Sequence, residues 1–175
     1  MTKRNSAGSD ILPFLENGVG QIAFVVEDIE SSVERYHSVF GVGPWDFYTY
    51  KKPFVPHMTY RGEPADYSVR IALSYFGPMR VELIEPVRGP TIYHEFIEKH
   101  GYGVQHLGLL VDDMSRALAQ AQAAGYPMIM DGAGFGADGD GHYAYLDTED
   151  DFGVVYELIE RPKGRKPPEK VYPSP

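Results

Sequence analysis

The chain has 175 residues, no cysteine, and a formal net charge of −9 from 16 basic and 25 acidic side chains. This length suits one domain or two small halves that share a fold, and the lack of cysteine excludes disulfides, thiolate metal sites and cysteine nucleophiles. The acidic balance argues against a nucleic-acid partner, and the apolar runs are too short to cross a bilayer. We therefore expect a cytoplasmic protein that binds a small molecule, without a nucleic-acid or membrane partner.

The predicted elements repeat along the chain. Residues 21–29 and 106–114 are each a short apolar run that ends in acidic residues and leads into an amphipathic helical pattern. An aspartate that suits an N-cap precedes each helical pattern, and a glycine that suits a helix end follows it. Further strands are predicted over 43–50, 67–76 and 79–85 in the first copy and over 127–130, 142–147 and 153–160 in the second.

A second repeat lies at the end of each copy. The sequence Glu-Leu-Ile-Glu occurs at 82–85 and again at 157–160. Because it falls at the same place in both copies, we interpret the chain as an α+β protein with two tandem βαβββ modules that form a cupped mixed sheet. The predicted organisation is an N-terminal tail over 1–14, a first module over 15–90, a second module over 91–161 and a proline-rich, extended C-terminal tail over 162–175 that lies on a partner subunit.

The first copy is longer than the second. The spacing between equivalent positions is 85 residues at the start of the copies (21 to 106) and 75 at their ends (82 to 157). We place the extra residues in 51–66, which contains three prolines and has no clean period. This insert is expected to be irregular.

Side-chain alternation brings four polar groups to one face of the predicted sheet. Successive side chains on a strand point to opposite faces, so the leucine of each Glu-Leu-Ile-Glu would lie under a helix while Glu82 and Glu157 point the other way. Gln21 and His106 occupy equivalent positions at the start of the two modules. Pseudo-twofold packing would bring the four side chains together.

This quartet predicts a metal site. Two buried carboxylates repel each other and are costly to desolvate, and a divalent cation removes both penalties. An amide oxygen, two carboxylates and an imidazole suit Mn, Co, Ni, Zn, Mg or Fe(II). We predict one divalent ion per chain, held by Gln21, Glu82, His106 and Glu157.

The layout resembles the vicinal oxygen chelate superfamily, which includes glyoxalase I, methylmalonyl-CoA epimerase, extradiol dioxygenases and drug-resistance proteins. The resemblance covers about residues 18–161 and implies two βαβββ modules around a metal. Residues 96–108 look most like the epimerase branch, whereas the quartet looks like that of glyoxalase I. The first strand departs from the epimerase pattern, which has histidine where Gln21 stands. We also expect a homodimer.

These observations favour a divalent-metal-dependent lyase or isomerase, of glyoxalase or epimerase type, that abstracts a proton next to a metal-bound carbonyl or hydroxyl. Glu82 or Glu157 would move the proton as general base and acid. One alternative is a non-haem iron dioxygenase, although Gln21 stands where ring-cleaving members have a histidine. The other is a metal-free small-molecule binding or resistance protein, against which the intact quartet argues.

Aromatic and histidine residues outside the quartet are candidates for the substrate pocket. Aromatic rings can wall a cavity, and histidines can border it. These candidates are Trp45, His57, Tyr60, His142, Tyr143 and Tyr145. The glycine-rich stretch 132–141 is interpreted as a mobile loop over the cup.

Overall fold

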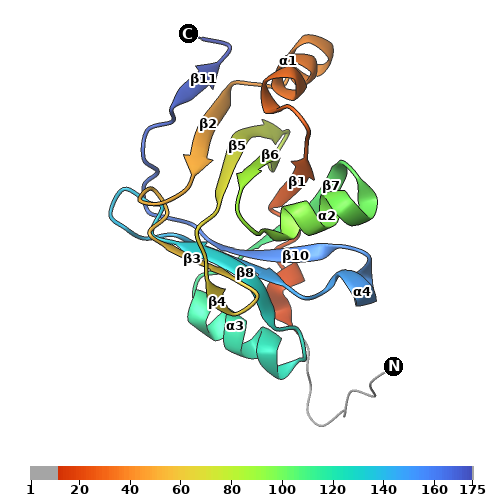
Figure 1. The fold of residues 1–175 in the computed structure, drawn as a ribbon, viewed down its shortest axis with the longest axis vertical. Helices are drawn as coiled ribbons and strands as arrows, with labels where there is room; N and C mark the ends of the chain where they lie inside the picture. Colours follow the sequence, from red (N-terminus) through yellow and green to blue (C-terminus); the bar gives the residue numbers. More distant parts are fainter. Residues whose placement is uncertain (1–11, 175) are drawn as a thin grey trace.

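The computed structural model describes residues 12–174, in which one mixed sheet of 11 strands is bordered by short helices (Figure 1). The strands are β1 Gln21–Val25, β2 Trp45–Tyr50, β3 His57–Tyr60, β4 Glu63–Pro64, β5 Ser68–Phe76, β6 Met79–Arg88, β7 Gly103–Leu110, β8 Met128–Ala133, β9 His142–Leu146, β10 Val155–Glu160 and β11 Lys170–Tyr172. The helices are α1 Ile29–Phe40, α2 Ile92–His100, α3 Met114–Ala123 and α4 Glu149–Phe152, with a 3-10 turn at Pro13–Leu15.

The sheet has the pseudo-twofold order that two βαβββ modules require. Its strands run in the order β11-β2-β5-β6-β1-β7-β10-β9-β8-β3-β4. Strand β1 is parallel to β6, β7 is parallel to β10, and β1 and β7 pair antiparallel at the centre. The sheet curls, with α1 and α3 at opposite ends of the molecule (Figure 1). The predicted α+β fold is confirmed.

Each module helix packs on the outer face of its own strands. Asp28 accepts a hydrogen bond from Ser31 N at 2.7 Å, and Asp113 accepts one from Arg116 N at 2.9 Å, so both predicted N-caps are present. The outer clusters contain the leucines of the repeated sequence, Leu83 with α1 and Leu158 with α3. The glutamates at 82 and 157 therefore face the inside of the cup, as alternation predicts.

The insert over 51–66 is more regular than the sequence indicates. It contains β3 and β4, which form a hairpin, and β3 pairs antiparallel with β8 of the second half, with His57 opposite Ala133. The prolines obscure this short hairpin in the sequence, because Pro53 and Pro56 precede β3 and Pro64 lies within β4. The backbone hydrogen bonds of β3 are supplied by a strand about 70 positions away, which local sequence does not reveal.

The C-terminal tail also pairs within the chain. Strand β11 lies antiparallel to β2, so the extended segment predicted to contact a partner subunit covers an edge of its own sheet. Of the predicted N-terminal tail, residues 1–11 lie outside the described part of the chain, while Phe14 is buried beside Leu109. None of the helices formed by residues 12–174 is long and apolar enough to span a membrane.

Candidate metal and active site

Four neighbouring central strands place the predicted quartet together inside the cup. Gln21 begins β1, Glu82 lies in β6, His106 in β7 and Glu157 in β10. All four belong to one chain and are buried, with exposed fractions of 4%, 7%, 0% and 3%, respectively. The pairing of β1 with both β6 and β7 brings residues from the two modules next to each other.

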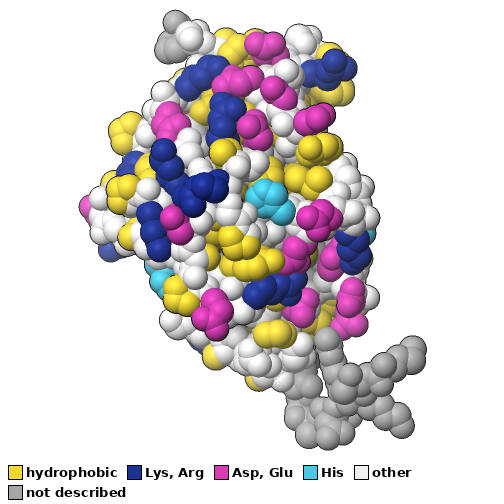
Figure 2. Space-filling view, viewed as in Figure 1, with side chains coloured by type: hydrophobic (Ala, Val, Ile, Leu, Met, Phe, Trp, Pro, Cys, Tyr) yellow, Lys and Arg dark blue, Asp and Glu magenta, His cyan; other side chains and the backbone are white. Residues whose placement is uncertain are grey.

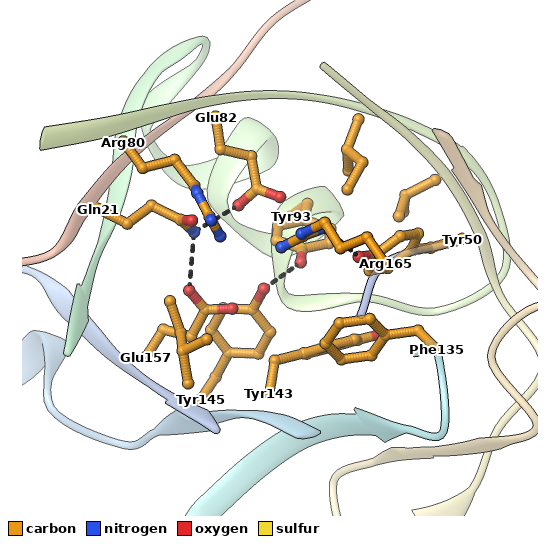
Figure 3. Close-up of a pocket in the computed structure, with 13 residues that line it drawn as sticks. Gln21, Tyr50, Arg80, Glu82, Tyr93, Phe135, Tyr143, Tyr145, Glu157 and Arg165 are labelled. Atoms are coloured by element: carbon orange, nitrogen blue, oxygen red, sulfur yellow. Dashed lines mark hydrogen bonds between the residues drawn. The ribbon is translucent and has the colours of Figure 1, made fainter. Parts of the chain in front are cut away.

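The polar atoms of the quartet converge on one point. Gln21 Nε2 donates hydrogen bonds to Glu82 Oε2 at 2.9 Å and to Glu157 Oε2 at 3.0 Å (Figure 3). His106 Nε2 lies 3.2 Å from Glu157 Oε2 and 3.5 Å from Glu82 Oε2. One potential ligand atom from each of Glu82, His106 and Glu157 lies within 4.8 Å of the other two. This spacing is compatible with a single shared cation.

His106 presents a donor atom that fits a metal. Its Nδ1–H donates to the side-chain oxygen of Gln105 at 2.6 Å, which directs Nε2 towards the carboxylates. Nε2 is fully buried and has no hydrogen-bond partner of acceptable geometry. A nitrogen and two carboxylates form an N/O donor set that suits divalent transition metals. For Gln21 to be a fourth ligand, its amide must rotate, because its NH₂ group now faces the carboxylates.

The electrostatics of the cluster reflect this proximity. Burial alone would lower the pKa of His106, but the carboxylates of Glu157 and Glu82 outweigh it and raise the pKa to about 9. Burial raises the pKa of Glu157, and the neighbouring charge of Glu82 adds to that rise, while His106 opposes it. Without a cation, the imidazolium is the group that balances the two carboxylates.

A small cavity opens next to the cluster and is walled by aromatic side chains. Its volume is about 30 Å³, which is room for about one or two water molecules. Glu82 and Glu157 both line it, whereas His106 lies behind them. Its tyrosine hydroxyls are paired, with Tyr93 and Tyr145 2.6 Å apart (Figure 3). Burial raises the pKa of both tyrosines, so both stay protonated at neutral pH.

A model of the Glyoxalase/Bleomycin resistance protein/Dioxygenase superfamily matches residues 20–145. The chain belongs to this superfamily. Uncharacterized protein YqjC of Bacillus subtilis (strain 168) is 32% identical over 96 residues, which are 55% of this chain and 67% of that protein.

Solved structures show the same fold. The methylmalonyl-CoA epimerase of Mycobacterium tuberculosis superposes with a TM-score of 0.57 at 19% identity, over 81% of this chain and 86% of that one. A methylmalonyl-CoA epimerase in complex with methylmalonyl-CoA and NH₄⁺ superposes with a TM-score of 0.58 at 20% identity, over 85% of this chain and 97% of that one. The match of the family model over residues 20–145 confirms the superfamily that the sequence resembles.

Some of the predicted pocket residues line the cavity, and others lie away from it. Tyr143 and Tyr145 line the cavity. Trp45 does not, because its ring lies on the outer face of the sheet in the cluster with α1. Tyr60 points away as well, and its hydroxyl donates to Glu95 at the surface of α2.

The two histidines among those candidates lie outside the cavity lining and form a separate cluster around a buried aspartate. His142 Nε2 is 2.7 Å from Asp131 Oδ2, and His57 Nε2 is 3.4 Å from the same oxygen. Thr59 donates to the other carboxylate oxygen. His57 is on β3, so this cluster depends on the hairpin that crosses to β8.

Several residues of the site were not predicted from the sequence. They are Tyr50, Arg80, Tyr93, Phe135 and Arg165, which line the cavity, and Gln105, which orients His106. Alternation could have found Arg80, because it lies two residues before Glu82 and shares its face of β6. No local signal identifies Arg165, which reaches the cavity from the C-terminal tail.

The predicted mobile loop is tied to that tail. Gly136 forms a bridge with Arg165, and Ala137 N donates to Gly164 O at 2.8 Å. Phe135 of the same loop lines the cavity. The stretch over 132–141 therefore covers the cup as expected, and its backbone holds the segment that carries Arg165.

Proposed function

We propose that this superfamily member is a divalent-metal-dependent isomerase or lyase that removes a proton next to a substrate carbonyl. The observation that supports this most is the convergence of Glu82, His106 and Glu157, whose ligand atoms lie within 4.8 Å of one another. The buried Nε2 of His106 makes no hydrogen bond there. Burying two carboxylates side by side is costly, and a divalent ion would offset that cost more fully than the single positive charge of the His106 imidazolium.

The residues divide into two roles. Glu82, His106 and Glu157 would hold the ion, with Gln21 as a fourth ligand after its amide rotates. A divalent cation here supplies positive charge that polarises a carbonyl and lowers the pKa of the adjacent C–H. Gln21, Glu82 and Glu157 also line the cavity, but of these only the two glutamates carry a group that can accept a proton at neutral pH. We therefore assign proton transfer to Glu82 and Glu157 as general base and acid.

The similar solved structures indicate which reaction to test first. Two of them are methylmalonyl-CoA epimerases, one in complex with methylmalonyl-CoA. Epimerisation requires removal and return of a proton next to a thioester carbonyl, which is the chemistry that two carboxylates beside a cation can perform. The homodimeric state and the cytoplasmic location stay predictions, and light scattering on the purified protein tests the first of them.

Deuterium exchange tests the proposed reaction. Metal-loaded protein is incubated in D₂O with methylmalonyl-CoA and with a panel of 2-substituted and 2-hydroxy acyl thioesters, and NMR follows the signal of the proton next to the carbonyl. We expect at least one compound to exchange that proton much faster than in the enzyme-free control, and only with metal present. Exchange by no compound, or exchange that persists in a metal-stripped sample, would contradict the proposal.

A further inference from the structure

Two arginine side chains point into the cavity from different parts of the chain. Arg80 comes from β6, beside Glu82, and Arg165 comes from the C-terminal segment (Figure 3). A third, Arg161, follows β10 and lies near both. Burial lowers the pKa of Arg161, and the positive charges of Arg80 and Arg165 lower it further. Three arginines therefore lie close together in a protein of net charge −9, and two of them line the cavity.

The segment that carries Arg165 is held in place on both sides. Lys163 N donates to Asp140 Oδ2 at 2.8 Å, and Gly136 bridges Arg165 itself. Further on, Glu169 N donates to Phe47 O at 2.9 Å before β11 pairs with β2. The segment thus runs from the end of β10 to the edge of β2 (Figure 1). Arg165 is a positioned side chain and not the end of a loose tail.

The cavity arginines lack the carboxylate partners that other arginines have. Arg61, Arg70 and Arg88 form ion pairs with Glu95, Glu30 and Asp66, respectively. In the described part of the chain, neither Arg80 nor Arg165 forms an ion pair with a carboxylate.

Their remaining contacts are weak. Arg80 is buried, and its guanidinium lies over the ring of Tyr75, 5.9 Å from the ring centroid. Arg165 donates a long bond of 3.4 Å to Tyr50 OH. Glu82 and Glu157 line the same cavity, but neither lies within ion-pair distance of a guanidinium, so both arginines keep N–H donors for an incoming anion.

We propose that Arg80 and Arg165 together bind an oxyanion of the substrate, a carboxylate or a phosphate, beside the Glu82–His106–Glu157 cluster. This inference deepens the proposed function and rests on it, because it states that the acted-on carbonyl compound is an anion. A guanidinium offers two parallel N–H donors that match the oxygens of either group. A cavity of about 30 Å³ cannot contain such a group as it stands, so binding must displace the Arg165–Tyr50 contact.

Anion binding to the full-length, metal-stripped protein tests this assignment apart from metal chemistry. The probes are malonate and inorganic phosphate, with uncharged malonamide as the matched neutral compound. The readouts are calorimetric affinity and the NMR signals of the arginine Nε–H groups. We expect saturable binding of malonate, phosphate or both, with shifts of the Arg80 and Arg165 signals, and no binding of malonamide. The tighter of the two anions identifies carboxylate or phosphate as the group recognised.

Arginine variants give the decisive comparison. Arg80→Gln and Arg165→Gln should each weaken anion binding by about 10-fold or more, since each removes charge-assisted hydrogen bonds. Arg88→Gln removes the same charge from an exposed ion pair and should leave the affinity unchanged. The proposal is overturned if wild type binds neither anion, or if Arg88→Gln weakens binding as much as the other two. Metal content, measured in parallel, reports separately on the proposed function.

Discussion

Glu85 and Glu160 perform the same task in the two modules. Glu85 Oε2 accepts a hydrogen bond from Ile29 N, the first residue of α1, at 3.0 Å, and Glu160 Oε2 accepts one from Met114 N, the first residue of α3, at 2.6 Å. Each repeated Glu-Leu-Ile-Glu therefore directs its first acid into the cup and uses its last acid to cap the helix of its own module.

Removing the Glu160 cap of α3 should lower the stability of the protein and leave the metal site intact. Glu160→Ala leaves Met114 N without its carboxylate and should lower the free energy of unfolding by about 0.5–2 kcal/mol. Urea denaturation of wild type and variant measures the difference. Metal stoichiometry should be unchanged, because Glu160 points away from the cluster. If Glu160→Ala kept the stability of wild type but lost the metal, Glu160 would belong to the metal site and not to the cap of α3.

Substitution of Glu82 or Glu157, the first acid of each repeat, should instead lower turnover. Glu82→Gln and Glu157→Gln keep the side-chain size and one oxygen donor but remove the basic carboxylate. We expect kcat to fall by about 10²–10⁴-fold with metal still bound. Turnover and metal content, measured on the same preparation, check this, with Glu85→Gln as the matched control from the same motif. If both variants keep metal and near-full turnover, the carboxylates are structural and the base lies elsewhere.

Gly108 is predicted to be needed for the geometry of the cluster. A Cβ at this position would lie 2.7 Å from Ile159 Cδ1 and 2.8 Å from Gln21 Cβ. Both distances are shorter than the non-bonded contacts that Cβ atoms make in proteins. Gly108→Ala should therefore displace Gln21, weaken metal binding and destabilise the fold by about 1–3 kcal/mol. Gly164→Ala is the control, because its Cβ would meet only Ala137 Cβ at 3.9 Å. Equal metal affinity in both variants would contradict the close packing around Gln21.

The contribution of Asp131 to the stability of the protein should depend on pH. Burial would raise its pKa, but hydrogen bonds from His142 and Thr59 outweigh this and hold the pKa below that of an ordinary aspartate. A lowered folded-state pKa stabilises the protein above the unfolded-state value of about 3.9, and this stabilisation is lost as the pH falls through the folded-state pKa.

A comparison of two pH values checks the sign. Asp131→Asn removes the charge, so the difference in unfolding free energy between wild type and this variant should be about 1–3 kcal/mol near pH 6 and should shrink at about pH 3. The measurement is urea denaturation at both pH values. A difference that grows on acidification would show that Asp131 is destabilised as a carboxylate in the folded state.

The parts of the site that sequence could predict follow from local periodicity and repetition. Alternation along β6 and β10 places Glu82 and Glu157 inside the cup. The duplication gives Gln21 and His106 equivalent positions in the two modules. Trp45 was misplaced because an aromatic residue in a strand is equally suited to either face. Arg165 and the β3–β4 hairpin could not be predicted, because their positions depend on pairings with β2 and β8 that lie far away in the chain.

Metal titration tests the central claim most directly. Chelator-treated wild type is titrated with Co²⁺ and Mn²⁺ by calorimetry, and elemental analysis measures the ion retained after gel filtration. We predict one ion per chain in wild type and none retained by His106→Ala, which removes the imidazole ligand outright, while Glu160→Gln behaves as wild type. Wild type that binds no divalent ion, or His106→Ala that binds one as tightly as wild type, would contradict the metal site and the chemistry built on it.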